Sequence, residues 1–292
     1  MSSTAFVMFC YPSCEEFLSH TLASLNKQTD QDFDVVIFND NLESLNIICQ
    51  KFLNKTPQII SVSGSVPAIR SFGLNQMKTS GYSHVILGDA DDVFTSNRIK
   101  VTKQLLSEND VVVNDIDICN KSLKETSSAY FQNRLNSDTL LNRDDIRLHN
   151  YIGFTNSALR TDTIPEIQFN ENLIAIDWAL FTTILFENAR TLFTGATTTK
   201  YRIHQKSHYD LTSKNPANLS FLVDVKYRHY KFLAKQFREY EHEKNEFGLL
   251  RQKLKDIEYF DRYKRAMIAQ LNKFPFWWEA AKLETEETIG CS

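Results

Sequence analysis

The chain has 292 residues, of which 42% are hydrophobic and 12% aromatic, so it carries enough apolar side chains for a substantial core and is too apolar for a disordered chain. Its formal net charge of -3 argues against a general nucleic-acid binder, which would need a basic surface. The five cysteines form no Cys-x-x-Cys pair, which argues against a zinc site or a disulfide framework and favours a reducing, cytoplasmic setting.

The first 120 residues alternate short apolar runs with longer amphipathic ones. Short runs rich in β-branched residues predict strands, whereas apolar positions three and four apart predict helices. The expected strands lie at 6–10, 34–38, 58–62, 84–87 and 110–114, and the expected helices at 15–26, 42–53, 67–78 and 97–107. This alternation predicts an α/β fold with a mostly parallel central sheet and helices on both faces.

The alternation ends after residue 120, where a polar stretch over 121–150 begins. The segments expected after it are a short strand within 151–158, an apolar helix over 174–186, an extended run over 191–201 and helices from 218 to 282. This change of pattern predicts a first domain over residues 1–212 and a C-terminal helical region over 213–292.

The most informative segment follows the strand expected at 84–87. That strand runs into Gly88 and then into three carboxylates, Asp89, Asp91 and Asp92. Ligands of open α/β sheets bind outside the carboxyl ends of the strands, and like charges this close repel one another unless a cation lies among them. Oxygen ligands suit Mn²⁺ or Mg²⁺. The alternative is a solvated turn whose aspartate caps the next helix.

A series of short segments lies in a fixed order along residues 5–208. They are Tyr11-Pro12 after the first strand, Ser24 to Gln28 at the end of the first helix, Asn39-Asp40 after the second strand, Pro67 to Leu74, the acidic run 87–92, Asp177-Trp178 on a later helix, and Tyr201 to His204. In this order they resemble the motifs of the family 2 nucleotide-diphosphosugar glycosyltransferases. The resemblance implies a GT-A fold, which is Rossmann-like, and an enzyme that transfers a sugar from a nucleotide-diphosphosugar.

The resemblance also assigns residues to the nucleotide-sugar donor. The donor-binding residues that it implies are Tyr11, Asp40, Arg70, Asp89 and Arg202. Arginine suits a diphosphate because its planar guanidinium binds phosphate with two parallel hydrogen bonds. The alternatives are a turn aspartate at position 40, an exposed helix charge at position 70, and a solvated basic loop around position 202.

For the metal, the resemblance implies Mn²⁺ or Mg²⁺ held by Asp91 and Asp89, with His204 completing the ligand set because neutral imidazole is a common ligand. Asp92 and His208 are further candidates. Such a metal would stabilise the negative charge on the nucleoside diphosphate as it leaves.

Asp177 is the expected general base for the acceptor hydroxyl, in a direct displacement that inverts the anomeric centre. The family often has Glu-Asp at this place, whereas this chain has Ile176 before Asp177. The alternative role of Asp177 is a helix cap, and that of Trp178 is core packing.

The predicted function is a metal-dependent, inverting glycosyltransferase that uses a nucleotide-diphosphosugar, with UDP-sugars favoured, and a glycan or lipid-linked acceptor. The segment 273–282, with adjacent tryptophans between lysines, suggests peripheral contact with the inner face of a membrane, or else packing in the core or in a homodimer. No signal peptide is visible at the N-terminus, which favours the cytoplasm.

Two rival functions stay open. Residues 89–93 also match the Asp-x-Asp-x-Val signature of haloacid-dehalogenase-like phosphatases, although that signature normally lies on the first strand of its domain. The non-enzymatic alternative is an inactive GT-A module that binds a nucleotide or glycan.

Overall fold

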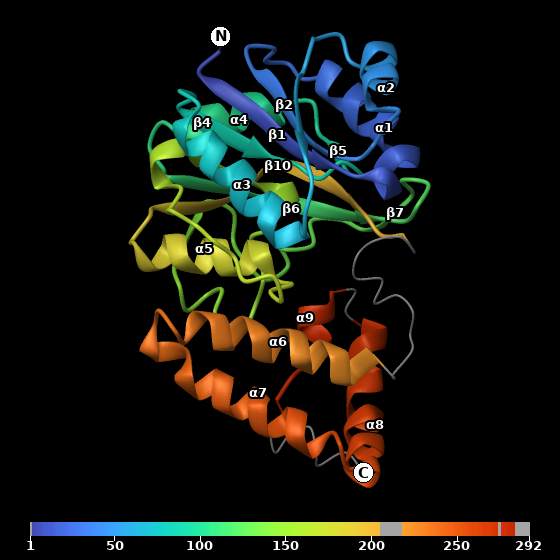
Figure 1. Cartoon of the computed structure of the whole chain (residues 1–292), viewed down its shortest axis with the longest axis vertical. Coiled ribbons are helices and arrows are strands. Elements are labelled where there is room, and N and C mark those ends of the chain that lie inside the picture. Colours follow the sequence, from blue (N-terminus) through green and yellow to red (C-terminus); the bar gives the residue numbers. More distant parts are fainter. Residues whose placement is uncertain (1, 205–217, 274–275, 284–292) are drawn as a thin grey trace. The chain divides into compact units, whose positions relative to one another are not determined.

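The computed structural model describes residues 2–204, 218–273 and 276–283 (Figure 1). The chain divides into two compact units. The described part of the first unit is 2–147, 151–171 and 180–204, and that of the second is 148–150, 172–179, 218–273 and 276–283. The domain boundary expected at residues 212 and 213 lies outside the described residues, so it stays a prediction.

The first unit is built on one ten-stranded sheet. Its strands are β1 (Thr4–Cys10), β2 (Asp34–Asp40), β3 (Gln58–Val62), β4 (His84–Leu87), β5 (Val93–Phe94), β6 (Val111–Cys119), β7 (Glu125–Ser127), β8 (Thr139–Leu141), β9 (Ser157–Arg160) and β10 (Thr191–Arg202). The spatial order is β3-β2-β1-β4-β9-β6-β10-β5, with β7 beside β6 and β8 beside β10.

Most of the long strands run in one direction. The strand β1 is parallel to β2 and β4, β2 is parallel to β3, and β10 is parallel to β6. The short strand β9 lies antiparallel between β4 and β6. The predicted α/β architecture with a mostly parallel sheet is therefore confirmed.

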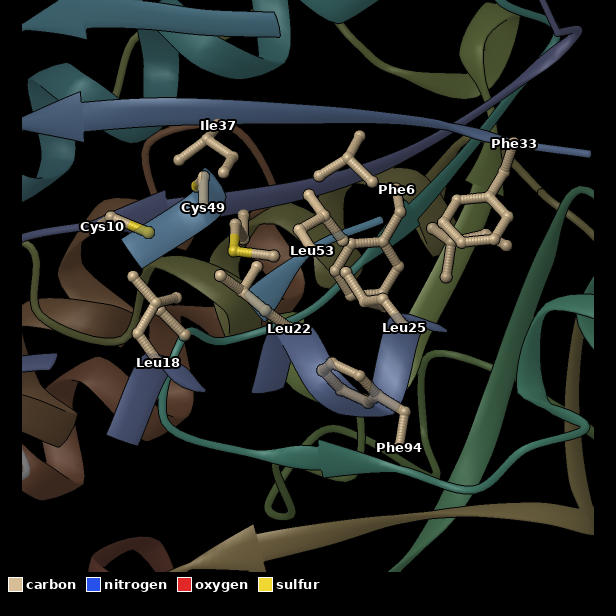
Figure 2. Close-up of a cluster of buried hydrophobic side chains, with 14 of the residues drawn as sticks. Phe6, Cys10, Leu18, Leu22, Leu25, Phe33, Ile37, Cys49, Leu53 and Phe94 are labelled. Carbon is tan, nitrogen blue, oxygen red and sulfur yellow. The ribbon is translucent and has the colours of Figure 1, made fainter. Parts of the chain in front are cut away.

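Helices cover both faces of this sheet. The helices are α1 (Glu15–Asn26), α2 (Leu45–Phe52), α3 (Val66–Thr79), α4 (Arg98–Leu105) and α5 (Ile176–Phe186). Alternate residues of β1, among them Phe6 and Cys10, join a core cluster with side chains of α1, α2 and α4, part of which Figure 2 shows. The opposite face of β1 carries Phe9, which lies against Gly73 of α3.

Gly88, which directly precedes the acidic segment, packs against two rings of this core. A Cβ atom at Gly88 would lie 2.3 Å from Cζ of Phe6 and 2.6 Å from Cζ of Phe94. The two rings pack edge to face with their centroids 5.0 Å apart. The residue after β4 must therefore be glycine, because any larger side chain would overlap these two rings.

The second unit is helical in its described part. It contains α6 (Leu219–Leu233), α7 (Glu241–Lys253), α8 (Ile257–Lys273), α9 (Trp277–Ala280) and the first turn of α5, whose remaining turns belong to the first unit. The helices α6 and α7 pack against each other (Figure 1). Their shared core stacks Tyr230 on Tyr240 and on Phe247. None of the described helices has both the length and the apolar character needed to span a membrane.

A lysine is buried in the core of the second unit. Lys226 of α6 is 3% exposed, with Nζ 5.3 Å from the ring centroid of Phe247. Burial, with a smaller contribution from Lys282, lowers the pKa of Lys226 to about 7, whereas the carboxylate of Glu279 opposes the shift.

Replacing Gly88 tests the packing under the acidic segment. We expect Gly88→Ala to lower the free energy of unfolding by about 1–3 kcal/mol, because the new methyl group overlaps two buried rings. Urea denaturation measures the change. Gly248→Ala in α7 is the control, since its Cβ would come no closer than 3.3 Å to a neighbour and alanine favours a helix. Equal stability of Gly88→Ala and the wild type would contradict this packing.

The buried lysine predicts a pH dependence. Because the folded pKa of Lys226, about 7, lies below the unfolded value, the unfolded chain binds more protons between these two pKa values. Stability therefore rises as pH increases across that window. We expect Lys226→Met to remove this slope and to raise the unfolding free energy at pH 7 by about 2 kcal/mol. Thermal unfolding at several pH values, with exposed Lys231→Met as control, tests this; an unchanged slope would disprove it.

Candidate functional site

The acidic segment lies at the carboxyl ends of neighbouring parallel strands. Val7 of β1 pairs with Leu87 of β4, and the N–H of Gly88 donates to the carbonyl of Val7 at 3.1 Å. Tyr11 follows β1, and β2 ends at Asp40 in the next strand along the sheet. The end of the sheet where open α/β folds bind ligands therefore carries Asp89 and its acidic neighbours.

Arg70 of α3 pairs with the first carboxylate. Its Nη2 lies 3.2 Å from Oδ1 of Asp89. The guanidinium also lies over two rings, with its carbon 4.1 Å from the centroid of Phe9 and 4.5 Å from that of Phe154. Its side chain is 11% exposed, and that of Asp89 is 28% exposed. The sheet face and the 3-10 turn at 154–156 thus hold a flat cation beside a partly open carboxylate.

Burial raises the pKa of Asp89, and the neighbouring Asp91 adds to this effect. The positive charge of Arg70 opposes it. Burial also raises the pKa of the Tyr11 hydroxyl, and the negative charges of Asp91 and Asp89 add to that shift. A cation arriving at this place would be attracted by the same negative charge that raises the pKa of Asp89.

Asp91 contacts His204 just beyond the end of β10. The distance between Oδ2 of Asp91 and Nε2 of His204 is 2.9 Å. The imidazole is held in place by Phe17 of α1, since the two ring centroids are 4.2 Å apart. A carboxylate and an imidazole that are 113 residues apart in the sequence are therefore brought together, and their role as metal ligands stays a prediction.

Asp92 has a different environment from its two acidic neighbours. It is 1% exposed, and its oxygens accept from Oγ1 of Thr155 at 2.5 Å and from the N–H of Arg202 at 2.7 Å. Burial raises the pKa of Asp92 well above its ordinary value, and Asp91 and Asp89 add to the shift. Among the three acidic candidates, Asp92 is thus turned inward and ties the segment to the sheet.

The side chain of Arg202 holds the backbone of the acidic segment by a hydrogen bond. Its Nε donates to the carbonyl of Asp91 at 2.7 Å, and its Nη1 donates to the carbonyl of Lys121 at 2.6 Å. The guanidinium lies over Phe17, and Arg202 is 2% exposed. Its Nη2 has no hydrogen-bond partner within the described part of the chain. A direct contact of Arg202 with a nucleotide stays a prediction.

Two further supports are absent from the sequence-based site. The hydroxyl of Thr21 contacts the carbonyls of Ala90 at 2.9 Å and Asp92 at 2.7 Å. The fully buried Arg98 donates from Nη2 to the carbonyl of Leu87 at 2.7 Å. Burial lowers the pKa of Arg98 to about 9, against the opposing charges of Asp92 and Asp89. The sequence offers one signal for Arg98, a cation at the start of a helix that follows the acidic run.

Asp40 lies at the outer end of β2. Its Oδ1 accepts from Nδ2 of Asn41 at 2.9 Å, and Asn41 has a left-handed backbone with φ of 58°. Asp40 is half-buried. The carboxylate thus sits on a turn at the end of the strand, so that both the donor-binding role and the turn role remain compatible with its position.

Asp177 belongs to the second unit. It is the second residue of α5, where a carboxylate is favourable because of the helix dipole. Its Oδ1 accepts from the N–H of Trp178 at 2.8 Å, and its Oδ2 accepts from Nδ2 of Asn150 at 3.3 Å. Trp178 is 1% exposed, which confirms the core packing considered for it.

The residues at the acidic segment fit a divalent metal whose remaining ligands come from a substrate. Within the described residues, no group of three or more His, Cys, Asp or Glu side chains is arranged to hold a metal ion. Asp91 and His204 form a two-residue set of carboxylate and imidazole, which suits Mn²⁺. Since Mg²⁺ and similar ions are often held by one or two protein ligands together with substrate phosphates, Asp91 and His204 are the residues that would hold a metal binding with a diphosphate.

The sequence matches the model of the family described as glycosyl transferase family 2 over residues 5–164. No curated protein matches it. The structure resembles that of S. aureus TarS 1-349 in complex with UDP-GlcNAc, with a TM-score of 0.55 and 16% identity over 94% of this chain and 88% of that one.

Two more solved structures share the fold. The mannosyltransferase PcManGT from Pyrobaculum calidifontis, in complex with GDP-Man and Mn²⁺, has a TM-score of 0.57 at 10% identity, over 80% of this chain and 65% of that one. GalNAc-T7 with UDP, GalNAc and Mn²⁺ has a TM-score of 0.52 at 12% identity, over 93% and 51%. These likenesses confirm the expected GT-A fold.

The stacked arginine generates a prediction. We expect Arg70→Lys to weaken UDP binding roughly tenfold, because lysine keeps the charge but neither stacks on Phe9 and Phe154 nor binds phosphate with two parallel hydrogen bonds. Titration calorimetry with UDP and Mn²⁺ measures this loss. Arg160→Lys is the control, since Arg160 forms an exposed pair with Asp162. Unchanged UDP affinity in Arg70→Lys would remove Arg70 from the donor site.

Proposed function

The chain belongs to glycosyl transferase family 2 and is a glycosyltransferase, and on this premise we propose a reaction for it. The proposed reaction transfers a sugar from a nucleotide-diphosphosugar, a UDP-sugar by preference, to a hydroxyl group of a glycan or lipid-linked glycan. The proposal includes a divalent metal, Mn²⁺ or Mg²⁺, and inversion at the anomeric carbon. Family membership favours this reaction over the phosphatase alternative.

One observation carries the proposal. At the carboxyl end of β4, Asp89 pairs with Arg70 while Asp91 contacts His204, so cationic and anionic groups lie side by side at the edge of the sheet. A nucleoside diphosphate needs both kinds of group, because its phosphates bind arginine directly and bind carboxylates through a divalent cation. A solvated turn would need neither the stacked guanidinium nor the buried support of Asp92.

The solved structures support the choice of donor and metal. TarS is described in complex with UDP and with UDP-GlcNAc, PcManGT with GDP-Man and Mn²⁺, and GalNAc-T7 with UDP and Mn²⁺. We carry over from them a nucleotide-sugar donor and a divalent metal. UDP is our preferred nucleotide because two of these three proteins, TarS and GalNAc-T7, are described with it.

The proposed roles follow from the groups present. Arg70 binds the diphosphate, and Asp40 and Tyr11 contact the nucleoside side of the donor. Asp91, Asp89 and His204 are the residues that would hold the metal, which when bound supplies positive charge to the leaving diphosphate. Arg202 stays a proposed donor-binding residue, and its Nε and Nη1 donate to the backbone carbonyls of Asp91 and Lys121.

The transfer exchanges one bond at the anomeric carbon for another. The acceptor oxygen forms the new bond to that carbon from the face opposite the leaving group, and the bond to the β-phosphate oxygen breaks. The nucleoside diphosphate leaves with the bonding electrons, and the hydroxyl proton passes to the carboxylate of Asp177. A general base in this role typically contributes about 10²–10⁴-fold to the rate.

The place of action and the further partners are also proposals. The four described cysteines are buried free thiols, which fits the cytoplasm, a reducing compartment. Part of the segment 273–282 lies outside the described residues. Trp278 in this segment is 3% exposed and stacks on Phe276, so we assign it to the core of the second unit. Peripheral membrane contact and a homodimer stay predictions.

The first test concerns the metal. We expect Asp91→Ala to abolish the increase in UDP affinity that Mn²⁺ produces, because the variant lacks the carboxylate that contacts His204 in the proposed metal site. Titration calorimetry with UDP, with and without Mn²⁺, measures that increase. Asp162→Asn is the matched control, since its carboxylate is exposed and pairs with Arg160. Retention of the full Mn²⁺ effect in Asp91→Ala would sink the metal assignment.

The second test concerns the base. We expect Asp177→Asn to lower the turnover number at least about 10²-fold while UDP binding stays unchanged, because an amide cannot accept the acceptor proton. The assay is release of UDP from UDP-sugars, in which a glycan or water is the acceptor. Near wild-type turnover in Asp177→Asn would mean that another residue is the base. Absence of UDP release by the wild type from every donor, despite tight binding of UDP, would favour the inactive-module alternative.

A further inference from the structure

Hydrogen bonds from different parts of the second unit reach the carboxylate of Asp177. The N–H of Trp178 donates to Oδ1 at 2.8 Å, and Nδ2 of Asn150 donates to Oδ2 at 3.3 Å. One donor is the backbone of the neighbouring residue in α5, and the other is a side chain from the short segment 148–150. The backbone of Trp178 and the amide of Asn150 therefore each help to set the direction of one carboxylate oxygen.

The indole of Trp178 is in turn fixed by α6. The imidazole of His229 stacks on it with ring centroids 4.2 Å apart and an angle of 25° between the planes. Tyr230 meets the same indole edge to face at 5.9 Å. Because Trp178 and His229 are 1% and 0% exposed, this stack is internal to the second unit and excludes water.

His229 is an unusual residue for a purely structural position. Neither of its ring nitrogens has a hydrogen-bond partner within the described part of the chain. A buried polar ring without partners costs stability, so a leucine or phenylalanine would serve a simple core better. Burial, with a contribution from the charge of Lys226, lowers the pKa of His229 to about 3, so the ring stays neutral at physiological pH and can lie flat against the indole.

We propose that Asn150 and His229 are positioning residues for the general base: Asn150 by its hydrogen bond to Asp177, and His229 by holding Trp178, whose N–H binds the same carboxylate. The C-terminal helix α6, which lies beyond the matched family region, thereby takes part in the reaction. This inference rests on the proposed function, because it assumes that Asp177 is the base.

The experiment compares five variants with the wild type. His229→Ala removes the stack, His229→Phe keeps a flat ring without nitrogens, and Asn150→Ala removes the hydrogen bond. Asp177→Asn tests the base itself, and Phe221→Ala is the matched control, since Phe221 lies on α6 and is 47% exposed. The turnover number and KM are measured for release of UDP from UDP-GlcNAc, UDP-glucose and UDP-galactose with water as acceptor.

A second readout does not depend on turnover. Labelling with ¹⁵N-tryptophan gives signals from only three residues, and a Trp178→Phe variant assigns the one of interest. The hydrogen-exchange rate of the Trp178 backbone amide then reports its hydrogen bond to Asp177. A general loosening of the core would accelerate exchange at the other labelled amides as well.

The proposal predicts a specific pattern. His229→Ala and Asn150→Ala lower the turnover number about 10–100-fold while KM for the donor changes less than about threefold, because misplacing a reacting group costs rate and not donor binding. His229→Phe retains turnover within about threefold of the wild type, and Phe221→Ala is unchanged. In His229→Ala the Trp178 amide exchanges at least about tenfold faster than in the wild type.

The possible outcomes distinguish the positioning role of Asn150 and His229 from the assignment of Asp177 as the base. If Asp177→Asn is inactive while His229→Ala and Asn150→Ala keep wild-type turnover, the positioning role is wrong and the base assignment holds. If Asp177→Asn keeps its activity, the base and the positioning role both fail. If the wild type releases no UDP from any donor, the proposed function fails, and unchanged amide exchange at Trp178 in His229→Ala would overturn the positioning role separately.

Discussion

The first unit depends on one constraint: three carboxylates within four residues must be held at the edge of a sheet without repelling each other out of place. Buried residues that contact the backbone of this segment meet the constraint. Gly88 has no side chain, so the backbone packs directly on Phe6 and Phe94. The buried guanidinium of Arg98 donates to the last carbonyl of β4, and that of Arg202 donates to the carbonyl of Asp91. These contacts hold the acidic segment in a fixed position, as the proposed donor site requires.

The same supports separate the roles of the acidic residues. Asp92 is buried, and its two oxygens accept hydrogen bonds from the hydroxyl of Thr155 and the N–H of Arg202. Asp89 and Asp91 remain at the edge, one beside Arg70 and the other beside His204. The cluster is thereby divided into one carboxylate that anchors the segment and two, paired with Arg70 and His204, that we propose to bind the ligand. The division explains how a segment this acidic can exist before any cation or nucleotide binds.

Much of the first unit can be predicted from its sequence because local patterns decide it. The strand 58–62 and the helix 15–26 are found with the predicted bounds, since apolar periodicity and short β-branched runs specify them. The short strand expected within 151–158 is found as β9, at Ser157–Arg160. The extension of β6 to Cys119 and the two-residue β5 depend on pairing between distant segments, which leaves no local signal. For the same reason Thr21 and Arg98 are missed, because their importance comes from contacts with the acidic segment that only the fold creates.

The most direct test of the central claim, that the acidic edge of the sheet binds the donor, is a crystal structure of the chain soaked with UDP and Mn²⁺. An anomalous difference map locates the manganese without reference to any assumed site. We expect one manganese beside Asp91, with the diphosphate of UDP next to it and within hydrogen-bond distance of Arg70. UDP or manganese bound elsewhere on the chain, with the Asp91–His204 contact undisturbed, would contradict it.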